Sequence, residues 1–213
     1  MSSTDDLEAL AGLADPARRR LYDLVAASPH PVGRAEAAEA AGISRTLAAF
    51  HLDKLAESGL LDSHFQPPAK KGPGSGRPAK VYTRARQERT VSLPPRDYVT
   101  LAAVLAETVE LLDAQDKAEQ AARKAGEKLA AGGGDLIETL RERGYEPYAE
   151  GEQIRLRNCP FHTLAEDQPV LVCSLNLALC QGLLQGLGQD PARVSLDPRP
   201  GECCVAVSKT NEN

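Results

Sequence analysis

Aromatic residues are scarce in this sequence. Tryptophan is absent, and Phe, Tyr and Trp together make up 4% of the 213 residues. Hydrophobic residues nevertheless reach 42%, which suffices for one or two packed domains in a chain of this length. Leu, Val and Ala must therefore fill the core, and such cores favour helices with small contacts.

The sequence also lacks segments that direct a protein to a membrane. Its N-terminus is polar and acidic, without the basic and apolar regions of a signal peptide. The longest apolar run, residues 170–179, contains Ser174 and Asn176 and is too short to span a bilayer. We therefore expect a cytoplasmic protein without a membrane partner.

Catalytic patterns are missing as well. The sequence shows no glycine-rich phosphate loop, no paired acid–base carboxylates and no Ser/His/Asp array, and an enzyme needs such converging groups. Internal repeats are also missing. We therefore do not expect an enzyme.

Cysteine is absent from the first two-thirds of the chain, and all five cysteines follow: Cys159, Cys173, Cys180, Cys203 and Cys204. Thiols stay reduced in the cytoplasm. Five cysteines in that compartment indicate metal ligands or redox sensors better than a disulfide framework. Their segregation predicts a thiolate site in one domain.

Charge is unevenly distributed. The formal net charge of −5 alone argues against a nucleic-acid-binding protein. Residues 70–89, however, hold seven basic side chains and one acidic side chain, Glu88; the basic ones are Lys70, Lys71, Arg77, Lys80, Arg84, Arg86 and Arg89. A local basic patch on an acidic protein is a common footprint of DNA contact.

The first ninety residues have the pattern of a helix-turn-helix. Helical spacing over residues 7–27 is interrupted at Asp15-Pro16, which predicts a short helix and then a longer one capped by Asp15. A short helix over 34–41, a turn at Gly42-Ile43 and a helix over 44–58 follow. Along the last helix we expect an inward face with these residues: Leu47, Phe50 (or His51), Leu52 and Leu55.

The N-terminal part of that last helix is the expected DNA-reading surface, because such residues meet bases and phosphates in the major groove. The candidates are Ser44, Arg45, Thr46, Ala48, Ala49 and His51. Strands at 61–65 and 80–84 enclose a Pro-, Gly- and Lys-rich tip and predict a wing. Four basic residues of the wing are expected to reach phosphates or the minor groove: Lys70, Lys71, Arg77 and Lys80.

Residues 44–61 and the run Gly76-Arg77-Pro78-Ala79-Lys80-Val81-Tyr82 resemble ArsR/DeoR-type winged-helix regulators. The resemblance covers about the first ninety residues. It implies binding to a double-stranded DNA operator. The alternative is a helix-turn-helix used only for protein contact.

We expect an α+β chain in three parts: a winged helix-turn-helix at 1–92, a dimerisation helix at 93–131 and a small α+β sensor domain at 132–213. Residues 96–131 have an apolar stripe followed by an Ala-, Lys- and Glu-rich part, which predicts one long helix. That helix could pair with its counterpart in a homodimer. An ordinary intrachain helix remains the alternative.

Single cysteines from a loop, a helix and a strand are expected to converge in the sensor domain. Cys159 follows a strand, and Cys173 is placed in the first turn of a helix over 170–187. Cys203 and Cys204 open the last strand, where only one of them should face a shared site because strand side chains alternate. Cys180 lies about two helical turns beyond Cys173 and is expected to pack in the core.

The segments 158–162, 171–173 and 200–205 resemble SufR-type repressors of iron–sulfur cluster assembly genes. This resemblance implies a [4Fe-4S] or [2Fe-2S] cluster on Cys159, Cys173 and one of Cys203 or Cys204, with His162 among the candidates for a fourth ligand. It also implies that the cluster-loaded form binds DNA and represses. Alternatives are a zinc site on Cys159, His162, Cys173 and Cys203, a reversible disulfide and inert buried cysteines.

Overall fold

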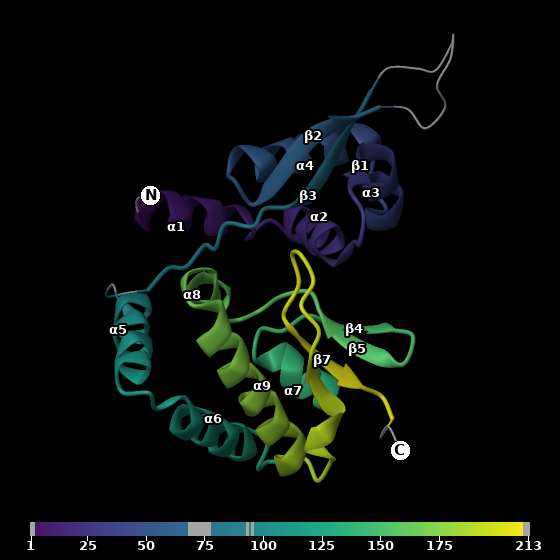
Figure 1. The fold of residues 1–213 in the computed structure, drawn as a ribbon. Helices are drawn as coiled ribbons and strands as arrows, with labels where there is room; N and C mark the ends of the chain where they lie inside the picture. The colour runs from purple at the N-terminus through teal and green to yellow at the C-terminus, as the bar shows by residue number, and fades with distance from the viewer. Residues whose placement is uncertain (1–2, 68–77, 93, 95, 211–213) are drawn as a thin grey trace. The chain divides into compact units, whose positions relative to one another are not determined.

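The computed structural model describes residues 3–67, 78–92, 94 and 96–210 (Figure 1). The chain divides into two compact units, Met1–Arg96 and Asp97–Asn213. Each unit has its own hydrophobic core. Residues 97–131, expected to form a separate dimerisation helix, belong to the second of these units.

Among its described residues the first unit has four helices: α1 (Ser3–Gly12), α2 (Pro16–Ala27), α3 (Arg34–Ala41) and α4 (Arg45–Glu57). Asp15 caps α2 by accepting hydrogen bonds from the backbone of Ala17 and Arg18, as predicted from Asp15-Pro16. Gly42 ends α3 with a φ of 66°, a left-handed conformation that glycine adopts without steric cost. These local signals set the helix-turn-helix.

A three-stranded antiparallel sheet completes the first unit: β1 (Val32–Gly33), β2 (Leu61–Gln66) and β3 (Ala79–Arg84), in the order β1-β3-β2. The expected strands at 61–65 and 80–84 are confirmed and form a hairpin. The two-residue strand β1 was not predicted. The core beneath the sheet is built from Leu21, Leu52, Leu55 and Tyr82, among others.

The second unit begins with two helices, α5 (Tyr98–Leu111) and α6 (Gln115–Leu129). The expected single helix over 96–131 is therefore wrong. The break falls at 112–114, where Asp113 has a φ of 47°, which is incompatible with a continuous right-handed helix. The sequence did not predict this break in the helix, because residues 112–114 include neither proline nor glycine.

Helix α6 packs closely against α9 (Pro169–Gly186) through glycines (Figure 1). A Cβ on Gly126 would lie 2.1 Å from the carbonyl oxygen of Leu179, and one on Gly182 would lie 2.0 Å from that of Arg123. Gly186 meets Glu127 and Ala130 in the same way. Glycine is required at these positions because the two backbones are in contact.

A four-stranded antiparallel sheet in the order β4-β5-β7-β6 contributes to the second core. Its strands are β4 (Pro147–Glu150), β5 (Gln153–Leu156), β6 (Val194–Leu196) and β7 (Val205–Ser208). The remaining helices are α7 (Leu136–Glu142), α8 (His162–Asp167) and the 3-10 turn η1 (Pro191–Arg193). The small α+β architecture of this region agrees with the sequence prediction, although α8 was not predicted.

Helix α9 has the length and apolar composition of a membrane-crossing helix, and no other helix among the described residues has both. Its buried side chains, however, join the core of the second unit, as Cys180, Leu183 and Leu184 show. We interpret α9 as the central helix of that core.

Candidate DNA-binding surface and cysteine cluster

The N-terminal part of α4 presents an accessible surface. Ser44 caps the helix by accepting a hydrogen bond of 3.2 Å from the backbone N–H of Leu47. Arg45 and Thr46 are exposed, and Ala49 is half-buried. These four predicted contact residues therefore lie where a groove of DNA could reach them.

Two other predicted contact residues face the protein. Ala48 and His51 are buried with Leu52 and Leu55, so the expected placement of Ala48 on the exposed face is wrong. Of the two residues considered for the inward position, His51 is buried and Phe50 is exposed. The helical period explains this, because residues 48, 51, 52 and 55 share one face.

Leu47 was expected inside, as was Phe50 with His51 as its alternative, and both Leu47 and Phe50 are exposed, by 41% and 56% respectively. Sequence reasoning missed them because α4 has apolar residues on more than one side. The neighbouring helices α2 and α3 cover only one of those sides.

Asp53 on α4 connects the helix to the hairpin. It accepts hydrogen bonds from Lys80 Nζ at 2.7 Å and from the Tyr82 hydroxyl at 2.7 Å, and one from Arg34 at 2.6 Å. Burial alone would raise the pKa of Asp53, but the hydrogen bonds from Lys80, Tyr82 and Arg34 lower it to about 2. Burial and the bond to Asp53 raise the pKa of Tyr82 to about 12.

Lys80 was expected to contact phosphate, and its ammonium group is instead held by Asp53. Lys80 is the second residue of β3 and pairs with Phe65 near the end of β2. The other three predicted wing cations, Lys70, Lys71 and Arg77, lie outside the described residues.

The structure brings four of the five cysteines together. Cys159 and Cys203 are in hydrogen-bonding contact, as are Cys203 and Cys204, and Cys204 also contacts Cys173. Cys203 and Cys204 come before β7 and not within it. Strand alternation therefore does not apply to them, and the expectation that only one faces the site is wrong. Cys173 is the fifth residue of α9, beyond the first turn in which it was predicted.

One sulfur in this cluster is the preferred site of negative charge. Hydrogen bonds from Cys159 and then Cys204 lower the pKa of the Cys203 thiol, with a further bond of 3.2 Å from the side-chain amide of Asn176. The bond to Cys203, together with burial, raises the pKa of Cys159 and of Cys204. A thiolate at Cys203 thus has donors on several sides.

Cys180 lies deeper in the core, as predicted. Burial raises its pKa to about 12, and its sulfur lies 3.8 Å from the Tyr145 hydroxyl. That hydroxyl donates a 2.5 Å hydrogen bond to Asn176. Tyr145 and Asn176 therefore separate Cys180 from the other four sulfurs and orient the amide that donates to Cys203.

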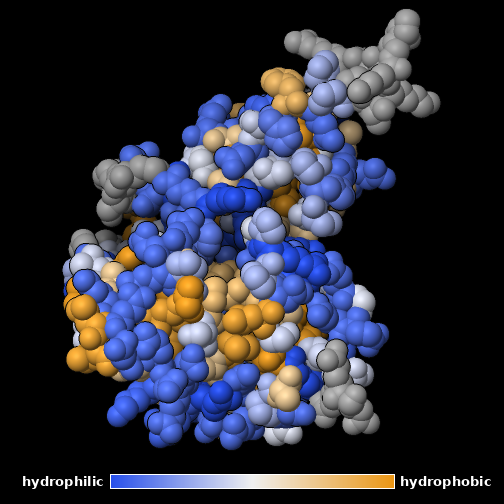
Figure 2. Space-filling view, in the orientation of Figure 1, coloured by the Kyte–Doolittle hydropathy of each residue, from blue (hydrophilic) through white to orange (hydrophobic). Residues whose placement is uncertain are grey.

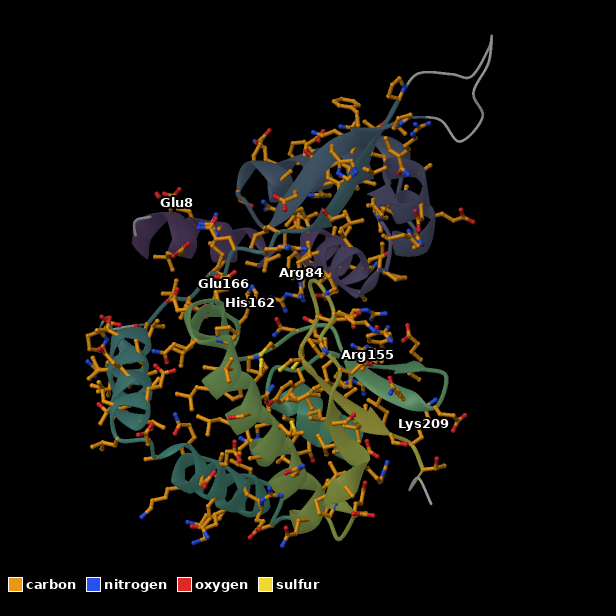
Figure 3. The ribbon with its side chains drawn as sticks, in the orientation of Figure 1. Glu8, Arg84, Arg155, His162, Glu166 and Lys209 are labelled. Carbon is orange, nitrogen blue, oxygen red and sulfur yellow. The ribbon has the colours of Figure 1, made fainter. Side chains whose placement is uncertain are left out.

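The side chain of His162, a predicted ligand, is paired with a carboxylate. His162 is the first residue of α8, is more than half exposed, and its Nε2 lies 3.3 Å from Glu166 on the same helix (Figure 3). Within the described ranges, no group of three or more His, Cys, Asp or Glu side chains is arranged as a metal-binding site. The four thiols therefore form a series of pairwise contacts and not a preformed cage.

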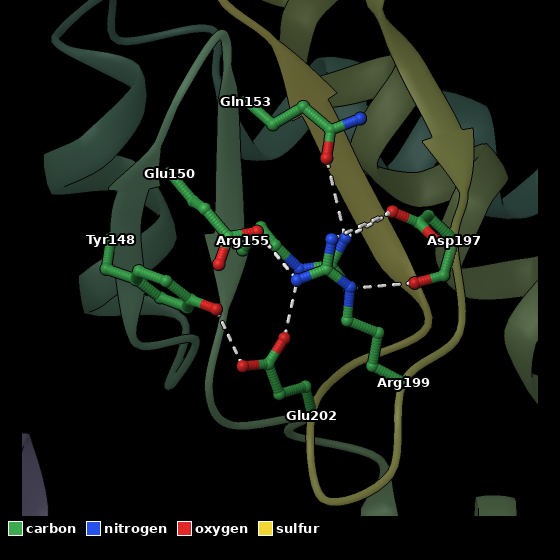
Figure 4. A network of polar contacts seen from close by, with 7 residues as sticks. All are labelled: Tyr148, Glu150, Gln153, Arg155, Asp197, Arg199 and Glu202. Atoms are coloured by element: carbon green, nitrogen blue, oxygen red, sulfur yellow. Dashed lines mark hydrogen bonds and ion pairs between the residues drawn. The ribbon is translucent and has the colours of Figure 1, made fainter. Parts of the chain in front are cut away.

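The loop that carries Cys203 and Cys204 is anchored by a buried arginine (Figure 4). Arg155 on β5 is fully buried and bonds Glu202 at 3.0 Å, the carboxylate of Asp197, and the Asp197 carbonyl at 2.8 Å. Glu202 also accepts a bond from the Tyr148 hydroxyl. The backbone N–H of Cys203 bonds the Leu156 carbonyl. Both ends of the loop are thereby fixed to β5.

Comparison with known families adds one match. Residues 13–64 match the family model of a helix-turn-helix domain. The matched segment includes α2, α3 and α4 and ends within β2. The chain therefore contains a helix-turn-helix domain, the class found in DNA-binding transcriptional regulators, and the match supports the resemblance to ArsR-type regulators in this region. No curated protein and no solved structure matches the chain.

Proposed function

We propose that the protein is a cytoplasmic, homodimeric, winged-helix repressor whose affinity for a DNA operator is set by an iron–sulfur cluster on its C-terminal cysteines. The observation that carries the proposal is the convergence of four thiols in one unit of a chain whose other unit contains the helix-turn-helix. In this proposal α4 reads the major groove and the β2–β3 hairpin is the wing.

The surface of α5 supports a homodimer. Seven large hydrophobic residues on α5 or at its C-terminal end are exposed: Tyr98, Val99, Leu101, Val104, Leu105, Leu111 and Leu112. Figure 2 shows hydrophobic side chains gathered on this side of the second unit. Monomeric proteins rarely expose apolar patches of this kind. A second copy of α5 would cover the patch and place two recognition helices for two operator half-sites.

The donor set of the cysteine cluster fits a thiolate-ligated group. Cys159, Cys173 and one or both of Cys203 and Cys204 would be the ligands, and the Asn176 amide would donate to the ligand sulfur of Cys203. Hydrogen bonds to ligand sulfurs tune the potential of iron–sulfur clusters. Side-chain rotation is needed to convert the pairwise contacts into a common site, because thiol contacts now satisfy the sulfurs. When bound, such a cluster supplies a charge that responds to oxidation.

Anaerobic purification followed by iron, sulfide and zinc analysis tests this proposal. We expect matching iron and sulfide, a brown protein, and tighter operator binding by the loaded form than by the stripped form. Cys159→Ser and Cys173→Ser should lose the iron, whereas the control Cys180→Ala should keep it. Equal operator binding by loaded and stripped protein would refute cluster control. One zinc and no sulfide would point to a zinc-dependent repressor.

The pairing of Cys159 with Cys203 favours a thiol switch as the second candidate. Thiolates are the nucleophiles in disulfide formation. In that reaction the two thiols lose two electrons and two protons, and hydrogen peroxide accepts them to give water. Mass mapping of peroxide-treated, metal-free protein should then find a Cys159–Cys203 disulfide together with altered operator affinity. Unchanged thiols would exclude it.

A further inference from the structure

The outward face of α4 carries an exposed aromatic ring. Burial of residues 48, 51, 52 and 55 fixes the rotation of the helix. At 100° per residue, Phe50 then lies on the side of the helix away from the buried face, with Thr46 one turn before it, and its ring contacts the edge of the His51 ring with the centroids 5.3 Å apart. Leu47, three residues before Phe50, lies to one side. The position of Phe50 on the exposed side is therefore set by burial of the opposite face of α4 and by the contact with the His51 ring.

Exposed apolar residues in the first unit are concentrated on two elements. The large hydrophobic residues exposed in its described part are Leu7, Leu47, Phe50 and Phe65. Three of these lie on α4 and β2, the helix and the hairpin strand proposed to face DNA. The sequence has three phenylalanines and no tryptophan. Two of the three phenylalanines, Phe50 and Phe65, are exposed on these two elements.

The distribution of charged residues along α4 also favours its outward face as the surface that contacts DNA. The only charged side chain in its first two turns is Arg45. Asp53, at the start of the following turn, is neutralised by Lys80 and Arg34. Phe50 therefore projects from a helix whose N-terminal part is nearly free of negative charge, which suits the approach of a phosphate-lined groove.

We infer that Phe50, with Leu47 beside it, reads thymine methyl groups in the major groove. This inference rests on the proposed DNA-binding function and assigns a specificity to it. The major-groove edge of a thymine carries a 5-methyl group, and apolar side chains including Phe recognise it by contact. Arg45 and Thr46 on the same helix would supply the polar part of the readout.

The test compares thymine with deoxyuridine, which lacks only the methyl group. A binding site is first selected from random duplex DNA with the full-length protein, and each thymine is then replaced singly. Burial of one methyl group corresponds to about a fourfold change in affinity. We expect one or two thymines at which the wild type loses about fourfold, and we expect Phe50→Ala to bind thymine and deoxyuridine equally there.

Leu7→Ala is the control, because it removes an exposed apolar side chain of α1, in the same unit but outside the helix and hairpin proposed to face DNA. It should keep the discrimination at the thymines that Phe50 reads. Circular dichroism should show unchanged folding for both variants, since both side chains are exposed. If Phe50→Ala discriminates as well as the wild type, or if no thymine replacement changes affinity, the inference is overturned while DNA binding stands. Failure of the wild type to bind any duplex would overturn the proposed function itself.

Discussion

Asp53 shows how one side chain can organise a small unit. It joins α4 to β3 through Lys80 and Tyr82, and to α3 through Arg34. Asp53 had no predicted role, because its three donors come from residues 34, 80 and 82, which are distant from it in the sequence. Long-range polar contacts of this kind leave no periodic signal in the sequence.

The depressed pKa of Asp53 predicts pH-dependent stability. Its pKa is about 2 in the folded protein against 3.8 for the unperturbed carboxyl group. The stabilisation is therefore complete above about pH 5 and is lost as the pH falls through 3.8 towards 2. We expect Asp53→Asn to lower the unfolding free energy of the helix-turn-helix unit by about 1 kcal/mol at pH 7, a discounted value because the carboxylate is about one-third exposed.

Urea unfolding at several pH values would measure this effect. The difference between wild type and Asp53→Asn should shrink towards zero near pH 2. Glu57→Gln is a suitable control, since Glu57 forms only an exposed pair with Lys54 and its loss should cost less than about 0.5 kcal/mol. A pH-independent difference for Asp53→Asn would contradict the assigned role.

Arg45 and Lys54 allow a paired test of base reading on α4. Arg45 is exposed in the first turn, and Lys54 is exposed in the last turn beside Glu57. We expect Arg45→Ala to weaken binding to the selected operator by about tenfold or more, with a smaller loss on random DNA. Lys54→Ala should have little effect on binding to either the operator or random DNA. Competition binding at fixed salt measures the ratio of the affinity for the operator to the affinity for random DNA. Equal losses on all sequences for Arg45→Ala would argue against base readout.

At the scale of the element, local signals predicted the fold well and tertiary contacts limited the rest. Caps at Asp15 and Ser44 and the glycine at Gly42 are local, and α2, α3 and α4 followed from them. The break at Asp113 has no such signal. Cys203 and Cys204 were placed at the start of a strand that continues to Val207, yet Arg155, distant in sequence, holds the preceding loop outside the strand. Because a strand was expected there, the sequence did not predict that the thiols of both Cys203 and Cys204 join the cluster.

The close packing of α6 on α9 predicts a sharp intolerance. In Gly182→Ala the added Cβ would overlap the backbone of Arg123, and the two helices would have to separate. We expect a loss of about 3 kcal/mol in unfolding free energy, at the upper end for overpacking. Gly132→Ala is the control, because nothing lies within 4 Å of its added Cβ. Thermal unfolding would compare them, and equal midpoints would contradict the packing described.

At the scale of the whole molecule, the exposed face of α5 predicts the oligomeric state. The wild type should sediment as a dimer. Leu105→Glu places a charge within the exposed apolar face of α5 and should yield monomers, because an unpaired charge is costly to bury. Leu196→Glu, on β6 and also exposed, should leave the dimer intact. Analytical ultracentrifugation distinguishes these outcomes, and a monomeric wild type would remove the proposed partner of α5.

The glycine contacts between α6 and α9 also have a mechanical consequence. Backbones in direct contact cannot slide past one another without a clash, so the two helices move as one rigid body. Helix α9 carries Cys173, and α6 is joined to α5 by the short segment 112–114. A displacement of α9, and of Cys173 with it, would therefore move α6 as well.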